Sequence, residues 1–280
     1  MIEETINENQ ITGFGINLLR NERAAPTIQK YVRTVYELAV FVKKRPLTKE
    51  LLLEYRKHLR EKYKAQTVNG KVSAINSFMD YSGLPHLKMN LLRVQRRAFV
   101  DDDRELSEAE YKRLLLAAKR EQNERLYNVM LTICSTGIRI SELKYITAEN
   151  VRRGRAEISM KGKERVILIP KELRLKLKVY ADKNNIRRGC IFITKSGKTL
   201  DRSNICHDMK KLCNAARVDA HKVFPHNLRH LFARSYYKVE KNLAHLADIL
   251  GHSSIETTRI YVAVSAKQCE HMMSRMQLII

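Results

Sequence analysis

The segment from Phe224 to Tyr261 constrains the fold of this 280-residue chain most, because three helical patterns follow one another in it. Pro225 suits the first position of a helix. The apolar stripe of that helix is formed by Leu228, Leu231 and Phe232. A second pattern ends at Gly251, the residue type that most readily takes the left-handed conformation after a helix. The capping-box spacing of Ser253 and Glu256 predicts a third helix.

Four polar side chains occupy fixed positions on these helices. His226 and Arg229 share one helix face because they are three residues apart. His252 follows the end of the second helix, and Tyr261 lies on the third. An arginine offers paired donors to phosphate oxygens, imidazoles carry protons, and a phenol can attack phosphorus. Each residue taken singly is more often structural, so only the combination predicts a catalytic phosphate site.

The segment TGIRISEL, residues 136–143, places Arg139 directly after a predicted helix break. An arginine between two core helices is costly unless its charge is paired or used. Glu142, one turn further on, is its natural partner. The alternative interpretation is a surface arginine in an ordinary ion pair.

The residues from Arg155 to Pro170 alternate with a period of two, which predicts two short strands joined through residues 161–164. Lys161 then lies at the rim of a hairpin, where it can enter a DNA groove. A basic hairpin tip is ordinarily just solvated, and Lys163 is the chief rival for any special role.

Several of these motifs resemble those of the tyrosine recombinases, the phage integrase and Xer-like family. HNLRH at 226–230, LGHSS at 250–254 and ETTRIY at 256–261 resemble the family's box II region. TGIRISEL resembles box I, and MKGKERVILIP at 160–170 resembles the hairpin that carries the family's lysine. On this resemblance the catalytic residues are Arg139, Lys161, His226, Arg229, His252 and the nucleophile Tyr261, with Glu142 in support.

The resemblance implies a site-specific recombinase that cleaves and rejoins DNA through a 3′-phosphotyrosyl intermediate and a Holliday junction. Integration, excision, inversion and resolution all remain open. The family needs no metal or cofactor, and acts on double-stranded DNA with paired recombination sites as a homotetramer. A type IB topoisomerase-like enzyme and a non-enzymatic DNA-binding regulator are the alternatives. No accessory arm-binding domain is expected, because the helical module starts within the first few residues, which favours a simple Xer-like or resolvase-like system.

The charge of the chain also indicates a polyanionic partner. Lys and Arg number 53 and Asp and Glu number 30, so the net charge is 53 − 30 = +23. A merely solvated basic surface is the alternative. The five cysteines show no zinc-binding spacing, and no apolar run has the ~18 residues of a membrane span. We therefore expect a cytoplasmic, nucleoid-associated protein with free thiols.

The expected fold is mainly α with a small β-sheet, in two domains. Residues 1–95 predict a four-helix bundle that resembles the SAM-like core-binding domain of the family, which would clamp the DNA face opposite the catalytic domain. Residues 96–106 predict a linker, and 107–280 a mixed α/β catalytic domain with a C-terminal tail. Within it, 189–200 predicts another small strand pair. The tail carries an apolar stripe that the resemblance assigns to exchange between subunits; packing on its own domain is the alternative.

Overall fold

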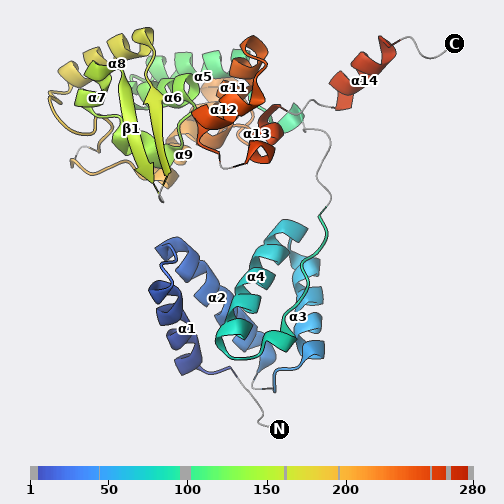
Figure 1. Cartoon of the computed structure of the whole chain (residues 1–280). Coiled ribbons are helices and arrows are strands. Elements are labelled where there is room, and N and C mark those ends of the chain that lie inside the picture. Colours follow the sequence, from blue (N-terminus) through green and yellow to red (C-terminus); the bar gives the residue numbers. More distant parts are fainter. Residues whose placement is uncertain are drawn as a thin grey trace. The chain divides into compact units, whose positions relative to one another are not determined.

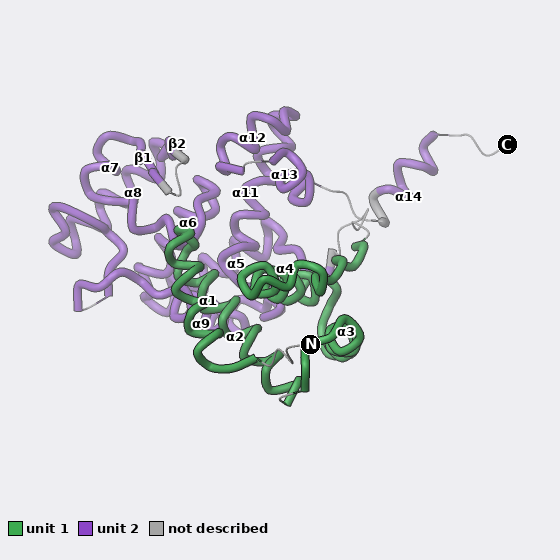
Figure 2. Tube along the Cα trace, turned by 60° about the horizontal axis from the view of Figure 1, so that its bottom comes forward, with its two compact units in different colours: residues 1–96 green, residues 97–280 purple. Residues whose placement is uncertain are grey.

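The computed structural model describes residues 6–43, 45–94, 102–160, 163–194, 196–252, 254–262 and 266–276. The chain divides into two compact units, Met1–Arg96 and Arg97–Ile280 (Figure 2). Each unit has its own hydrophobic core.

Unit 1 is a helical bundle, as the sequence predicts (Figure 1). Its helices are α1 (Glu8–Arg20), α2 (Ala25–Val42), α3 (Lys49–Lys62), α4 (Ala65–Tyr81) and the 3-10 turn η1 (Pro85–Leu87). Local capping explains two of the helix starts: Asn7 forms a capping box with Gln10, and Thr48 accepts from the backbone of Leu51. The core is fully buried and includes Phe14, Val35, Leu38, Leu52, Val72 and Phe78.

Unit 2 is mainly helical with one antiparallel hairpin, which agrees with the predicted fold class. Its helices are α5 (Glu108–Arg120), α6 (Glu124–Thr136), α7 (Ala148–Arg153), α8 (Lys171–Lys183), α9 (Arg202–Lys211), α10 (Cys213–Ala216), α11 (Pro225–Val239), α12 (Leu243–Leu250), α13 (Ile255–Val262) and α14 (Ala266–Ser274). Two 3-10 segments, η2 (Asp102–Arg104) and η3 (Ile140–Tyr145), complete the unit. None of the helices in the described ranges is both long and apolar enough to cross a membrane.

The hairpin consists of β1 (Arg155–Met160) and β2 (Lys163–Leu168), with Ile158 opposite Arg165. β1 packs against α7 and η3, and β2 packs against α12 (Figure 1). One face of the hairpin is buried in the core, through Ala156, Ile158, Ile167 and Ile169. Because side chains alternate along a strand, Arg165 lies on this inward face.

Two details of the hairpin and its surroundings differ from the prediction. β2 already begins at Lys163, so the connection is shorter than the expected 161–164. The expected strand pair in 189–200 is wrong for the described residues there, which form only isolated bridges, Thr147 with Cys190 and Ile193 with Thr199. One reason is that the first part of this segment bonds to the chain before α7, where Ile191 donates to the carbonyl of Ile146 at 3.0 Å.

The stretch predicted as a linker also differs in its second half. Leu106 is completely buried in the core of unit 2, and Glu105 pairs with two residues of α11. Glu105 and Leu106 are therefore packed parts of unit 2. The sequence did not predict this packing, because the three acidic residues at 101–103 are typical of a solvated linker.

Candidate active site

Two helix ends meet at the centre of the site. α6 ends at Gly137 and α12 ends at Gly251, and both glycines have φ of +64°, a left-handed conformation that favours glycine. A Cβ at Gly137 would lie 2.4 Å from a ring carbon of Phe232 on α11, so the close approach of α6 and α11 also needs glycine. At these two helix ends the carbonyl groups of Gly137 and Leu250 point toward one arginine of α11.

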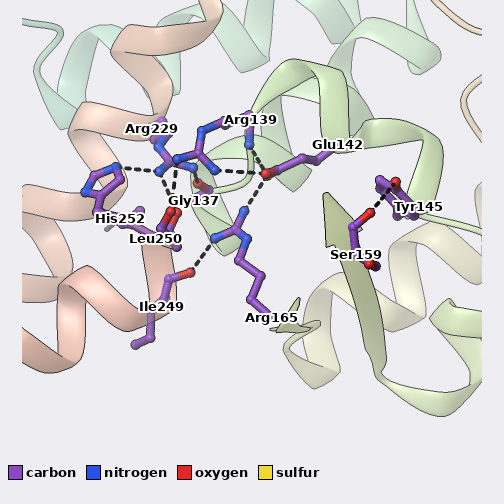
Figure 3. Close-up of polar contacts among 11 residues, drawn as sticks. Gly137, Arg139, Glu142, Tyr145, Ser159, Arg165, Arg229, Ile249, Leu250 and His252 are labelled. Atoms are coloured by element: carbon purple, nitrogen blue, oxygen red, sulfur yellow. Dashed lines mark hydrogen bonds and ion pairs between the residues drawn. The ribbon is translucent and has the colours of Figure 1, made fainter. Parts of the chain in front are cut away.

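That arginine is Arg229, which is only 1% exposed. Its Nη1 donates to the carbonyl of Gly137 at 2.7 Å, and its Nη2 donates to the carbonyl of Leu250 at 2.7 Å (Figure 3). Nη2 also lies 2.8 Å from Nε2 of His252, while Nε has no hydrogen-bond partner in the described part of the chain. Burial, followed by the charge of Arg139, lowers the pKa of Arg229 to about 10.

Arg139 lies at the start of η3 and pairs with Glu142, as the sequence predicts. Its backbone N–H donates to Oε2 of Glu142 at 2.7 Å, and its Nη1 donates to Oε1 at 3.0 Å. A third bond runs from Nη2 to the carbonyl of Gly251 at 3.2 Å. Glu142 is buried, but the Arg139 side chain is 40% exposed, so its guanidinium is accessible from solvent. Arg139 and Arg229 thus bond to the carbonyl groups of adjacent residues, Gly251 and Leu250.

Arg165 is a member of this cluster that the sequence analysis missed. Its Nη2 donates to Oε2 of Glu142, and its Nη1 donates to the carbonyl of Ile249 at 2.6 Å (Figure 3). The side chain is 11% exposed, and burial lowers the pKa of the guanidinium. The alternation that places Ile167 and Ile169 on the inward face was the available signal, because it also turns Arg165 inward.

The cluster carries excess positive charge. Arg139, Arg165 and Arg229 supply three guanidinium groups and Glu142 one carboxylate, so the sum is 3 − 1 = +2. Buried charge of one sign is costly unless an ion of the opposite sign joins it. The Nε atoms of Arg165 and Arg229, which have no hydrogen-bond partner among the residues that the structure describes, fit the same interpretation. The cluster is thus suited to bind an anion with several oxygens, such as a phosphate.

His252 is held between two partners with opposite roles. A guanidinium only donates, so Nε2 of His252 accepts from Arg229. The proton of the ring is therefore on Nδ1, which donates to Oγ1 of Thr258 at 2.8 Å. Burial, then the charges of Arg229 and Arg139, lower the pKa of His252 to about 3. Thr258, which is completely buried, was also missed from the sequence.

Tyr261 joins the site through its hydroxyl group, which lies 3.3 Å from Nε2 of His226. Its side chain is 7% exposed and packs with Ala233, Leu246 and Leu250. The ring stacks on that of His252, with centroids 5.3 Å apart. Loss of hydration, followed by the charges of His230 and Arg229, lowers the pKa of His226 to about 4, so the imidazole is neutral at pH 7.

The structure therefore brings five of the six predicted catalytic residues, and Glu142, into one connected cluster. The sixth, Lys161, lies outside the described residues. Among the described residues, no group of three histidine, cysteine or acidic side chains could hold a metal ion. The arrangement, a tyrosine hydroxyl beside an imidazole and a cluster of guanidinium groups suited to a phosphate, is the one that enzymes cleaving phosphodiesters with a tyrosine nucleophile would need.

Comparison with known sequences agrees with this class. The model of the phage integrase family matches residues 104–268. Tyrosine recombinase XerA of Pyrococcus furiosus is 25% identical over 100% of this chain and 98% of its own. Tyrosine recombinase XerD of Halalkalibacterium halodurans is 25% identical over 94% of this chain and 95% of its own. The chain thus belongs to the phage integrase family of tyrosine recombinases, enzymes that cleave and rejoin DNA. The topoisomerase and regulator alternatives are not favoured.

Solved structures share the fold. A lambda integrase dimer bound to a COC′ core site has a TM-score of 0.73 at 15% identity, covering 93% of this chain and 78% of the other. The XerH recombinase in a post-cleavage complex with palindromic difH substrate has a TM-score of 0.71 at 16% identity, covering 98% of this chain and 90% of the other.

Proposed function

We propose that this protein is a site-specific recombinase whose Tyr261 attacks a DNA backbone phosphate. The Tyr261 oxygen forms a bond to phosphorus and the bond to the 5′ oxygen breaks, which leaves a 3′-phosphotyrosyl link and a 5′-hydroxyl. The observation that carries the proposal is the hydroxyl of Tyr261 at 3.3 Å from His226, which lies one helical turn from the phosphate-binding Arg229.

Arg139 and Arg229 bind the non-bridging oxygens and stabilise the charge of the transition state. Arg229 is fixed to two backbone carbonyls before the substrate arrives, so little reorganisation is needed. Loss of one such donor typically costs about 10² to 10³ in rate. Glu142 orients Arg139 through its two bonds to that residue.

Protons move at both ends of the reacting bond. His226 is neutral at pH 7 and takes the proton of Tyr261, and Lys161 gives a proton to the departing 5′ oxygen. The negative phosphate favours protonation of nearby imidazoles. When Arg229 turns its Nη2 from His252 to the phosphate, Nε2 of His252 is free to take up a proton. The protonated Nε2 then donates a hydrogen bond to the phosphate.

Rejoining needs no external energy source. The phosphotyrosyl bond retains the energy of the phosphodiester, so a 5′-hydroxyl of another strand can attack it and release Tyr261. Two such exchanges on paired sites, through a Holliday junction, complete recombination without nucleotide or metal.

The assembly we propose is a homotetramer on double-stranded DNA, in the cytoplasm and associated with the nucleoid. Residues 1–95 clamp the DNA as a core-binding bundle, and the tail of each subunit docks on a neighbour. Support comes from Met272 and Met273 of α14 and from Met276 just after it, which are 51%, 63% and 59% exposed. A lambda integrase tetramer bound to a Holliday junction has a similar fold, with a TM-score of 0.70.

The test first identifies target sites as the DNA that the protein protects from nuclease. A suicide oligonucleotide is then built on such a site, with a nick placed so that the cleaved end diffuses away and cannot be rejoined. Wild type should form an SDS-resistant DNA adduct, and Tyr261→Phe should bind the DNA but form none. Sequence-specific binding without an adduct in the wild type would overturn the catalytic proposal. Relaxation of supercoiled plasmids lacking paired sites would indicate a topoisomerase.

A further inference from the structure

The segment 104–108 is bound along one face of α11. Asn227 donates to the carbonyl of Arg104 at 2.7 Å, and Arg234 donates to the carbonyl of Leu106 at 2.6 Å. Between these two contacts lies Glu105, whose Oε1 is 3.2 Å from Nδ1 of His230. Asn227, His230 and Arg234 follow one another at helical spacing, whereas His226 and Arg229 of the active site project from the neighbouring face.

Glu105 is partly buried, with 12% of its side chain exposed, and it is charged. Burial alone would raise its pKa, but the hydrogen bond from His230 and the charges of His230 and Arg234 outweigh burial and lower the pKa. An ionised carboxylate only accepts hydrogen bonds, so Nδ1 of His230 carries a proton and donates. Glu105 thereby fixes both the protonation of Nδ1 and the orientation of the ring.

The ring of His230 touches the proposed nucleophile. Its centroid lies 4.3 Å from that of Tyr261, edge to face at 76°. It also lies 4.7 Å from the ring of His226, at 65°. His230 is therefore a common neighbour of Tyr261 and of the imidazole that faces the Tyr261 hydroxyl, while His252 stacks on the same phenol ring.

We propose that Glu105 and His230 are positioning residues for Tyr261: the carboxylate fixes the His230 ring, and that ring fixes the phenol beside His226. The inference rests on the proposed function. Residues 104–106, which were predicted to belong to a linker, would then help to position an active-site side chain.

The experiment measures single-turnover adduct formation on the suicide oligonucleotide with full-length variants. Glu105→Ala should cleave roughly 10- to 100-fold more slowly, since small misplacement of reacting groups costs up to about that factor. Glu105→Gln keeps an acceptor oxygen and should retain most of the rate. His230→Asn keeps a donor near the position of Nδ1 but lacks the ring, and should be as slow as Glu105→Ala.

Glu108 provides the matched control. It also pairs with α11, through Lys238 at 3.4 Å, but it is exposed and does not contact the histidine cluster. Glu108→Ala should cleave at the wild-type rate. DNA binding should stay within about twofold in every variant, and thermal unfolding verifies that each is folded.

A second substrate separates nucleophile positioning from help to the leaving group. With sulfur in place of the bridging 5′ oxygen, departure needs no proton, so the defects of Glu105→Ala and His230→Asn should persist. Wild-type rates in both variants, recovery on the sulfur substrate, or an equal loss in Glu108→Ala would overturn this inference alone. A wild type that binds DNA but forms no adduct overturns the proposed function and this inference together.

Discussion

Arg229 donates from Nη2 to Nε2 of His252 across 2.8 Å, and this bond determines which ring nitrogen of His252 carries the proton. The proton lies on Nδ1, which donates a hydrogen bond to the hydroxyl oxygen of Thr258. Thr258 on α13 therefore fixes the imidazole that holds Arg229 on α11. Because Tyr261 lies on the same short helix as Thr258, one element positions both the Tyr261 phenol and the support of Arg229.

Thr258→Val should weaken this arrangement. Valine has the same shape but cannot accept from Nδ1, and leaving a buried donor unsatisfied costs about 1–3 kcal/mol. We expect a loss of that size in the free energy of unfolding, and adduct formation slowed roughly tenfold. The exposed neighbour Thr257 is the control, because Thr257→Val should change stability by less than about 0.5 kcal/mol. Equal effects of the two substitutions in urea titrations would contradict the prediction.

Glu142→Gln should destabilise the protein strongly. Glu142 neutralises part of the charge of Arg139 and Arg165, and removing one partner of a buried ion pair costs about 3–5 kcal/mol. Urea denaturation at pH 7 measures the loss. Glu157→Gln, at a side chain that is 76% exposed, should cost less than about 0.5 kcal/mol. A loss no larger than that of Glu157→Gln would mean that Glu142 does not hold the arginines together.

Stability should fall as the solution is acidified from neutral pH. The folded-state pKa values of His226 and His252, about 4 and about 3, lie below the ordinary value of 6.5. Between these values the unfolded chain binds protons that the folded chain does not, so stability is complete above pH 6.5 and is lost as pH falls toward 4. Denaturant midpoints from pH 8 to pH 4.5 measure this slope. His252→Gln should flatten it, and His221→Gln, at an exposed site, should not.

Removing residues 266–280 should abolish cooperative assembly but not cleavage. The exposed methionines Met272, Met273 and Met276 bury apolar surface only if another surface covers them. Gel-shift titrations on paired sites should lose cooperativity, whereas the adduct on a single suicide site should form at the wild-type rate. A full-length variant with Met272, Met273 and Met276 replaced by Gln should behave as the truncation does. Unchanged cooperative assembly would count against tail exchange.

The helices of the site were predictable because their signals are local. Pro225 at the start of α11 and Gly251 after α12 act within a few residues, and α11 begins and α12 ends where these signals predict. The capping box of Ser107 and Glu110, which starts α5, is a local signal of the same kind. The strand pair expected in 189–200 failed because part of its backbone, around Cys190 and Ile191, bonds to residues before α7, which leaves a single bridge, Ile193 with Thr199, inside the segment.

The sequence by itself determined the helical units, the hairpin and the set of residue types that can handle a phosphate, since capping, periodicity and motif spacing are properties of neighbouring residues. Only the tertiary structure decided which partners meet. Arg165 reaches Glu142 across 23 residues, and His230 reaches Glu105 across 125. Such pairs carry no local pattern, because they depend on how helices and hairpin pack. Packing is thus what turns separate motifs into a charged site around Tyr261.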